Sequence, residues 1–189
     1  MRAQLGFVCL AAAMCALPAS AQSRVFELDA QQSRVTFTLP ATMHTVHGTF
    51  AFKNGRIEFN PATGAASGTI VLDATSGNTG NDGRDRKMHR DILESAKYPE
   101  IVFTARRLAG ELAAEGPSRI TLEGTFTVHG ASHPVSLACT VQAHAGAVTG
   151  DTSIVVPYVE WGLKNPSTFL LRVSDKVTVE IHAVGRVSR

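Results

Sequence analysis

Apolar and polar residues alternate along most of the chain from Val25 onward, with the two-residue period of β-strands. The clearest case is residues 119–128, where every second position is apolar or glycine and the positions between are polar or charged. About eight to ten segments of this kind follow one another, most of them separated by short turn sequences. Because each segment has one apolar and one polar face, antiparallel strands around a shared apolar interior are expected. The pattern therefore predicts an all-β protein.

Two all-β architectures fit this pattern. Glycine stands in the apolar register at Gly48, Gly68 and Gly124, which is typical of long strands that curve around a barrel. An up-and-down barrel of about eight strands can hold one small ligand in its interior. A sandwich of two sheets with a filled core fits the alternation as well, and the pattern by itself favours that filled core.

Local signals add two expectations within the strand pattern. The Asn-Gly dipeptide in Lys53–Gly55 is a common two-residue hairpin turn, so a chain reversal is expected there. A further strand is expected at Thr168–Val173, after a polar loop that contains Trp161.

One segment departs from the two-residue period and predicts a helix. Met88, Ile92 and Leu93 form a single apolar stripe at helical spacing, while the charged residues around them fall largely on other faces. A short α-helix is therefore expected near residues 84–96. In a chain made mostly of strands, such a helix is typical of a lid against a barrel or sandwich.

The sequence also predicts where this helix begins and ends. Asp82 or Asp85 could accept hydrogen bonds from the first free backbone N–H groups and so serve as the N-cap. Pro99 lacks a backbone N–H and restricts Tyr98 before it, so the helix should end at this pair.

The first residues have the features of a secretory signal peptide. Arg2 precedes an apolar run at residues 5–17, which is shorter than the roughly 20 residues that a membrane-spanning helix needs. Ala19 and Ala21 then form a small-x-small cleavage site. We expect residues 1–21 to be a cleaved signal peptide, the mature chain to begin at Gln22, and no stable insertion into the membrane.

Charge and cysteine content narrow the class of protein. The net charge is only +2 at pH 7, from 18 basic and 16 acidic side chains, and nothing indicates nucleic-acid binding. Cys9 and Cys15 lie in the predicted signal peptide, so Cys139 has no partner for an internal disulfide. Because Cys139 shares the apolar register with Leu137 and Val141, a buried free thiol is expected.

Motifs for catalysis or metal binding are missing from the sequence. The chain has seven histidines, but they are spread out, without an HExxH motif or paired cysteines. There is no Gly-x-Ser-x-Gly nucleophile elbow, and no base is visible near Cys139 in the sequence. We therefore expect neither a metal nor another cofactor, and we expect that the protein is not an enzyme.

The glycine-rich segment at residues 76–83 is the one candidate for anion binding. It precedes the predicted helix, so its free N–H groups could receive an anion with the help of Arg84 and Arg86. A flexible turn beside a solvated basic helix face is the alternative interpretation.

Motifs spread over nearly the whole mature chain resemble those of a known family. The most specific are Gly83-Arg84-Asp85 with Leu93, and Tyr98-Pro99-x-Ile101-x-Phe103. The others are Asp29-x-x-x-Ser33-x-Val-x-Phe37, Val46-His47-Gly48-x-Phe50, Gly124-Thr-Phe126-Thr-Val128-His-Gly130 followed by Pro134-Val135, and Val177-x-Val179-x-Ile181. Together they resemble the signature of the YceI-like family of periplasmic, lipocalin-like polyisoprenoid-binding proteins. The chain departs from the family pattern at Gln32, where a histidine is common, and at Glu160-Trp161-Gly162, where Asp or Asn followed by Phe is usual.

The resemblance implies a fold, a location and a ligand. The fold would be an extended antiparallel lipocalin-like β-barrel of about eight strands over residues 22–189, with the helix beside its mouth. The protein would be periplasmic and would bind, transport or sequester a long-chain isoprenoid or a similar amphipathic lipid. An open cavity is then favoured over a filled core. The residues expected to line the lipid tail are Phe37, Phe50, Phe52, Ile70, Phe103, Phe126 and Leu137, and Arg84 is a candidate contact for a charged head group.

Two other functions stay open at this point. One is an accessory enzyme or redox protein that acts on an isoprenoid quinone, although convergent titratable residues on the inward register are lacking. The other is a filled β-sandwich that interacts only through its surface, for which there is no distinguishing sequence feature. A homodimer is an open alternative to a monomer.

Overall fold

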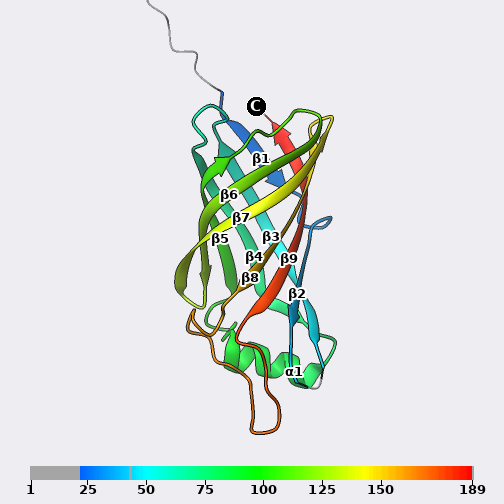
Figure 1. The fold of residues 1–189 in the computed structure, drawn as a ribbon, viewed down its shortest axis with the longest axis vertical. Coiled ribbons are helices and arrows are strands. Elements are labelled where there is room, and N and C mark those ends of the chain that lie inside the picture. Colours follow the sequence, from blue (N-terminus) through cyan, green and yellow to red (C-terminus); the bar gives the residue numbers. More distant parts are fainter. Residues whose placement is uncertain (1–21, 43, 189) are drawn as a thin grey trace, which may run out of the picture.

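The computed structural model describes residues 22–42 and 44–188, and the predicted signal peptide, residues 1–21, lies outside the described residues. The described chain forms strands and one short helical segment (Figure 1). The strands are β1 (Arg24–Leu28), β2 (Arg34–Leu39), β3 (Val46–Phe59), β4 (Ala66–Asn78), β5 (Glu100–Ala109), β6 (Gly116–Val128), β7 (Ala131–His144), β8 (Ala147–Val156) and β9 (Val177–Ser188). The helical segment consists of α1 (Asp82–Lys87) and a π-helical turn, η1 (Met88–Ile92).

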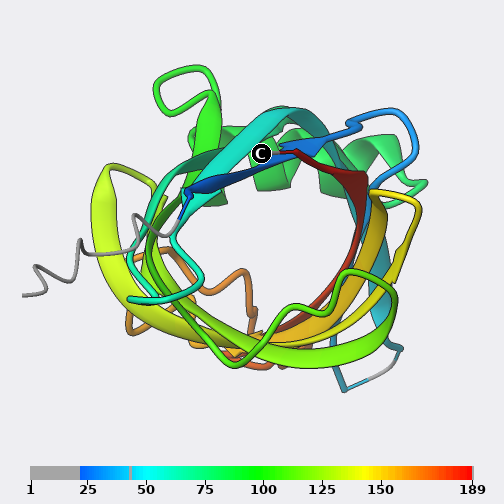
Figure 2. The ribbon, with the colours of Figure 1, turned by 90° about the horizontal axis from the view of Figure 1, so that it is seen from above.

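The strands close into an antiparallel barrel rather than a two-layer sandwich (Figure 2). Hydrogen bonds run from β4 through β5, β6, β7, β8 and β9, and the β3–β4 pairing completes the ring. The short strands β1 and β2 both lie between β3 and β9, one after the other, so the nine strands occupy the positions of an eight-stranded barrel. The barrel predicted from the sequence is confirmed, and the filled sandwich is wrong.

The junction between β1 and β2 is a turn that Asp29 organises. Its carboxylate accepts hydrogen bonds from the backbone N–H groups of Gln31 and Gln32 and from the Gln32 side chain, at 2.6 to 3.1 Å. The Gln32 side chain is the main reason that the pKa of Asp29 is lowered. The Ser33 hydroxyl then donates to the Asp29 carbonyl at 2.6 Å and accepts from the Val184 N–H at 2.9 Å, which ties the turn to β9.

The predicted hairpin at Lys53–Gly55 is wrong, because β3 runs through it without reversing. The strand pairs with β4 on both sides, and its register shifts between Phe52 and Asn54. The extra residue forms a bulge that changes the alternation, so Phe52 and Ile57 both point inward although they are five positions apart. Lys53 is the extra residue, and Asn54 and Gly55 pair with Val71 and Ile70, because β4 offers a continuous pairing partner along both halves of the strand.

The strand predicted at Thr168–Val173 is also wrong. This segment belongs to a loop at residues 157–176 that joins β8 and β9, and its contact with the barrel wall includes an isolated bridge between Ala41 and Val173. The Thr168 N–H donates to the Leu171 carbonyl at 2.8 Å. Local hydrogen bonds within this turn replace the ladder that a strand would need.

The predicted helix is present, but its first cap differs from the prediction. Asn81 is the N-cap, and its side-chain oxygen accepts from the Arg84 N–H at 2.9 Å. Asp82 is the first helical residue, and the Asp85 carboxylate accepts instead from the Thr79 N–H at 3.0 Å. Asparagine is as good an N-cap as aspartate, so nearby polar residues compete for the role and the loop geometry decides.

The helical segment ends at Ile92, several residues before Pro99. Glu94 adopts a left-handed conformation with a φ of 47°, which stops helix propagation. The Ser95 N–H then donates back to the His89 carbonyl at 3.0 Å. Among residues 22–42 and 44–188, no helix is both long and apolar enough to cross a membrane.

Glycines in the inward register allow phenylalanine rings to lie against the barrel wall. A Cβ atom at Gly124 would lie 2.8 Å from the Phe103 ring and 2.2 Å from the Thr104 carbonyl oxygen. A Cβ at Gly48 would lie 2.3 Å from the ring of Phe37. The missing side chains thus let neighbouring strands place large rings inside the barrel.

Candidate functional site

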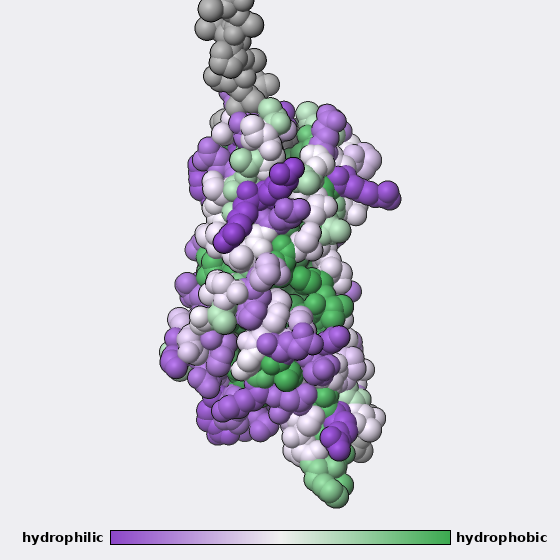
Figure 3. Space-filling view, turned by 60° about the vertical axis from the view of Figure 1, so that its left-hand side comes forward, coloured by the Kyte–Doolittle hydropathy of each residue, from purple (hydrophilic) through white to green (hydrophobic). Residues whose placement is uncertain are grey.

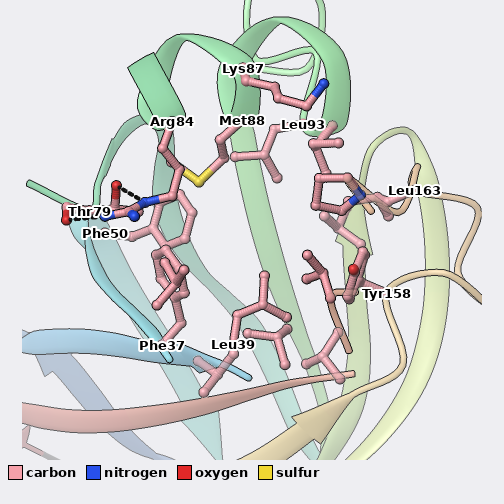
Figure 4. A pocket seen from close by; sticks show the side chains of 18 of the residues that line it. Phe37, Leu39, Phe50, Thr79, Arg84, Lys87, Met88, Leu93, Tyr158 and Leu163 are labelled. Atoms are coloured by element: carbon pink, nitrogen blue, oxygen red, sulfur yellow. Dashed lines mark hydrogen bonds between the residues drawn. The ribbon is translucent and has the colours of Figure 1, made fainter. Parts of the chain in front are cut away.

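An apolar cavity of about 520 Å³ lies at the end of the barrel covered by the helical segment (Figure 4). Its volume is within the range of about 300–1,000 Å³ that is usual for small-molecule sites. Its walls come from the barrel strands, the helical segment and the β8–β9 loop. The apolar lining includes Val35, Phe37, Leu39, Phe50, Leu72, Met88, Leu93, Val128, Val156, Leu163 and Val179.

A second apolar cavity of about 130 Å³ continues the interior toward the other end of the barrel. Leu72, Ile101, Phe126 and Ile181 border both cavities, so their side chains form the boundary between the two spaces. The barrel interior is therefore an elongated apolar space, narrowed at this boundary.

The structure distributes the predicted tail-lining residues over both cavities. Phe37 and Phe50 line the main cavity, and Phe126 borders both. The second cavity is lined by the remaining members of the set, Phe52, Ile70, Phe103 and Leu137. The alternation predicted the inward direction of these side chains, but not their division between two spaces.

Sequence reasoning missed part of the main cavity wall. Met88 and Leu93 belong to the predicted apolar stripe, and the helix places this stripe over the cavity (Figure 4). The apolar stripe was therefore a sequence signal from which these lining residues could have been found. Tyr158 and Leu163 come from the β8–β9 loop, where no periodic pattern marks inward positions.

Cationic side chains from the helical segment stand at the edge of the main cavity. Arg84 lines it and is held by Thr79, since its Nε donates to the Thr79 hydroxyl at 2.8 Å and its Nη2 donates to the Thr79 carbonyl at 2.9 Å (Figure 4). The Thr79 hydroxyl in turn donates to the Asp85 carboxylate. This chain of hydrogen bonds fixes the direction of the guanidinium.

Lys87 also lines the main cavity and shares a carboxylate with a neighbour. Its Nζ lies 3.5 Å from Asp91, and Arg90 donates to the same carboxylate at 2.7 Å. The hydrogen bond from Arg90, assisted by the charge of Lys87, lowers the pKa of Asp91 to about 2. Asp91 is therefore ionised at neutral pH and balances part of the positive charge at this edge.

The expected anion site before the helix is occupied by the chain's own side chains. The Arg84 N–H is taken by Asn81 and the Thr79 N–H by Asp85. These bonds use N–H groups that a bound anion would need, so the positive edge of the cavity depends on side chains rather than on the helix start.

His89 holds the helical segment against the barrel. Its Nε2 lies 2.8 Å from the Gly77 carbonyl oxygen and its Nδ1 lies 3.0 Å from the hydroxyl of Ser95, which is buried. Because a carbonyl can only accept, Nε2 donates to it. His89 thus connects β4 to the residues that follow the η1 turn.

Aromatic side chains from the β8–β9 loop are fixed within the main cavity wall. The Tyr158 hydroxyl donates to the Ser174 carbonyl at 2.7 Å. Burial, with a smaller contribution from the Asp175 carboxylate, raises the pKa of Tyr158 to about 12. Trp161 stacks on His133 with ring centroids 4.3 Å apart and an angle of 2° between the planes.

Cys139 is a half-buried free thiol in the wall of the second cavity, so the prediction of a free thiol holds but its burial is less than predicted. Burial raises its pKa, and the Sγ donates to the Leu137 carbonyl at 3.5 Å. It is only partly covered because its inward neighbours border a void rather than a packed core. Within the described part of the chain, no three His, Cys, Asp or Glu side chains gather as a metal-binding group.

A family model for the YceI-like domain matches residues 26–185. This chain belongs to the YceI-like family. A UPF0312 protein of Vibrio cholerae serotype O1 is 24% identical over 180 residues, which are 92% of this chain and 93% of the relative.

Solved structures show the same fold. BcnA of Burkholderia cenocepacia superposes with a TM-score of 0.67 and 19% identity, over 83% of this chain and 98% of that chain. A polyisoprenoid binding domain from Saccharophagus degradans, implicated in plant cell wall breakdown, gives a TM-score of 0.64 and 19% identity, over 86% of this chain and 98% of that chain. At such identities, the likeness establishes the barrel alone.

Several motif residues of this YceI-like chain hold turns together. Asp29 and Ser33 form the turn between β1 and β2. Tyr98 packs against the β6–β7 hairpin, where a Cβ at Gly130 would lie 2.8 Å from its ring and His129 lies 4.6 Å away between ring centroids. These residues stabilise the frame of the YceI-like barrel, whereas apolar residues of the same motifs, among them Phe37, Phe126 and Val179, line the cavities.

Proposed function

We propose that this YceI-like protein binds a long-chain isoprenoid or a similar amphipathic lipid inside its barrel. It would do so in the periplasm, as a carrier or store, after its signal peptide has been removed. The observation that carries the proposal is the elongated apolar interior with Arg84 and Lys87 at the edge of one end. The polyisoprenoid binding domain with the same fold supports the same class of ligand.

The interior suits a flexible hydrocarbon tail. Burial of apolar surface stabilises a complex by roughly 25 cal/mol per Å², and no directional contact is needed along the tail. A tail that fills the main cavity would reach the boundary at Phe126 and Ile101, beyond which the second cavity continues. The length of the tail would decide whether it crosses this boundary.

The edge near the helical segment suits a phosphorylated head group. The Arg84 guanidinium is already oriented by Thr79, so little of its conformational freedom remains to be lost when an anion binds. Lys87, whose Nζ lies 3.5 Å from Asp91, is a second cation on the same edge. An anionic head at this edge and a tail in the barrel form one consistent arrangement.

A binding role is favoured over chemistry on the lipid. Cys139 is the thiol nearest to the interior, but its raised pKa keeps it protonated at neutral pH, and its hydrogen bond goes to a backbone carbonyl rather than to a base. Tyr158 also keeps its proton and donates it to the Ser174 carbonyl. The side chains of Cys139 and Tyr158 are therefore explained by their hydrogen bonds to backbone carbonyls, without a catalytic role.

The test is native mass spectrometry of protein purified from its own periplasm, followed by thermal unfolding of the delipidated protein with and without a polyprenyl phosphate. A lipid that binds only the folded state should raise the melting temperature with increasing concentration. Absence of co-purified lipid, together with an unchanged melting temperature at every concentration, would overturn the proposal.

Neighbouring residues on β8 offer a matched pair of variants. Ile154 points into the main cavity, whereas Val155 points outward and is exposed. Ile154→Trp should fill part of the cavity and weaken lipid binding by at least about tenfold, which corresponds to about 1.4 kcal/mol. Val155→Trp adds the same ring outside the barrel and should bind like the wild type. Equal affinity of the two variants would contradict a site inside the barrel.

A further inference from the structure

The β8–β9 loop presents two large apolar side chains to solvent. Phe169 is 97% exposed and Leu170 is 82% exposed, which makes them the most exposed large hydrophobic residues of the described chain. The loop extends beyond the helical end of the barrel (Figure 1), and hydrophobic colouring marks its tip in the space-filling view (Figure 3). We call Phe169 and Leu170 the apolar tip.

The apolar tip sits on a turn whose polar groups are satisfied. The Thr168 N–H donates to the Leu171 carbonyl at 2.8 Å, and the Leu171 N–H donates to the Thr168 hydroxyl at 3.1 Å. Behind the turn, the Thr42 N–H donates to the Arg172 carbonyl at 2.9 Å. The apolar side chains are therefore held outward by a hydrogen-bonded turn that is attached to the segment between β2 and β3.

The same turn borders the main cavity. Thr168 and Leu171, on either side of the apolar tip, line the cavity, as does Pro166 earlier in the loop. Apolar surface thus extends from the tip to the interior of the barrel through one short segment. A hydrocarbon chain that leaves the cavity along this loop would remain in contact with apolar groups.

The charged residues nearest the apolar tip are basic, whereas the acidic residues of the β8–β9 loop, Glu160 and Asp175, lie nearer its two ends. Residues 163–174 include Lys164 and Arg172 and no aspartate or glutamate. Both basic residues are exposed. An apolar tip flanked by cations complements the interface of a bilayer, where acyl chains lie beneath anionic head groups.

We propose that the apolar tip inserts reversibly into a lipid bilayer with anionic head groups and brings the cavity to the membrane surface. The inference rests on the proposed lipid-binding function, because it gives the route by which a lipid would enter or leave. Two side chains are too small an area for a stable protein interface, which needs roughly 800 Å² per partner. They suit a transient contact in which only the tip enters the interfacial layer.

Vesicle flotation of the mature protein tests this contact. The vesicles contain phosphatidylcholine alone or phosphatidylcholine with phosphatidylglycerol. Wild type should float with the anionic vesicles, and Phe169→Ser with Leu170→Ser should lower the bound fraction at least tenfold. Val155→Ser with Val159→Ser, a control pair at exposed apolar positions away from the apolar tip, should float like wild type.

Charge variants and a fluorescent variant give independent readouts. Lys164→Gln with Arg172→Gln should weaken binding to anionic vesicles at least fivefold and reduce its salt dependence. Phe169→Trp should show a blue-shifted emission on vesicles that the native Trp161 alone does not show. Flotation of the tip variant at the wild-type level, or an unshifted emission of Phe169→Trp, overturns the inference.

Lipid transfer separates this inference from the proposed function. The tip variant should take a polyprenyl phosphate from vesicles at least tenfold more slowly than wild type, while binding farnesyl pyrophosphate from solution unchanged. Tip-dependent flotation without any isoprenoid binding would reject the proposed function and leave the membrane contact standing. Tip-dependent self-association in solution without flotation would instead assign the tip to a contact between copies and overturn the membrane inference.

Discussion

The guanidinium of Arg84 donates to both oxygens of Thr79, to the hydroxyl at 2.8 Å and to the carbonyl at 2.9 Å. The sequence makes Arg84 a candidate head-group contact because it directly follows the glycine-rich segment at residues 76–83. The structure shows in addition that its orientation is set by a residue that also lines the main cavity. A fixed cation at the edge of an apolar space should favour lipids with an anionic head group.

Removal of this cation should affect charged lipids selectively. Arg84→Ala should weaken binding of a polyprenyl phosphate about tenfold and leave binding of the uncharged polyprenol within about twofold, because only the phosphate loses a charge-assisted hydrogen bond. Arg86→Ala is the matched control, since Arg86 is exposed and does not line the main cavity. Calorimetric titration measures both ligands, and equal losses for alcohol and phosphate would contradict the head-group role.

Phe126→Ala should alter which tail lengths bind, with only a moderate effect on the stability of the protein. Its ring packs edge-on against Phe103 with centroids 5.4 Å apart, but it also borders both cavities. Truncation of a phenylalanine to alanine in a filled core lowers the free energy of unfolding by about 3–5 kcal/mol. We expect a smaller loss here because voids already adjoin the ring. Urea unfolding measures this cost.

The same variant should admit longer tails into the second cavity. Native mass spectrometry with a mixture of isoprenoid lengths should show a shift toward longer species for Phe126→Ala, and a smaller shift for Phe126→Leu. An unchanged length distribution with a full core-type loss of stability would show that Phe126 is a packing residue and not part of the boundary.

The Cys139 thiol should react slowly in the folded protein. Burial raises its pKa above the ordinary thiol value of 9.0, so the reactive thiolate forms only at high pH. Labelling with a thiol reagent should be much faster in denaturant than in native buffer, and bound lipid should slow it further because Cys139 lines the second cavity. Native labelling as fast as in denaturant is the result that contradicts this.

Tyr158 should make the folded protein sensitive to alkaline pH. Its pKa is about 12 in the folded state against an ordinary phenol value of 10.0, so the folded state retains the phenol proton to higher pH than the unfolded chain. The stabilising effect of the neutral phenol is complete below about pH 10 and is lost as the pH rises from about 10 to about 12.

Variants of the two tyrosines isolate this effect. In Tyr98→Phe, tyrosinate absorbance should report Tyr158 alone, with a midpoint near pH 12 while the protein stays folded. The difference in unfolding free energy between wild type and Tyr158→Phe should shrink over the same interval. A midpoint near pH 10 in folded protein would show that the phenol is accessible to solvent.

The mature protein should begin at Gln22. The reason is the Ala19-Ser20-Ala21 site, which follows an apolar run too short to span a bilayer. Intact-mass analysis of the exported protein gives the answer, and retention of residues 1–21 would reject the predicted cleavage.

The sequence by itself determined the direction of most side chains. Successive residues of a strand point to opposite faces, so alternation alone placed Phe37, Phe103 and Phe126 on the inside of the protein. Helical spacing in the same way gave Met88 and Leu93 one common face. These are local geometric properties of the backbone, and they depend on the residues within a few positions.

Only the tertiary structure decided the outcome where local signals had more than one solution. Lys53–Gly55 carries a hairpin signal, but β4 pairs with both sides of it and converts it into a bulge. Pro99 would stop a helix, yet Glu94 stops it earlier by turning into the left-handed region. The choice in each case depends on hydrogen-bond partners that lie far away in the sequence or on the path of the following chain.

The tertiary structure also decided whether the inward residues fill a core or surround cavities. Alternation cannot distinguish an inward residue that fills a core from one that borders a void, because both are apolar. Closure of the ring by β3 and β4, with β1 and β2 sharing one position, set a width that the side chains do not fill. The sequence therefore determined which residues face inward, and the barrel closure decided that they surround cavities, because the space between walls is a property of the whole ring of strands.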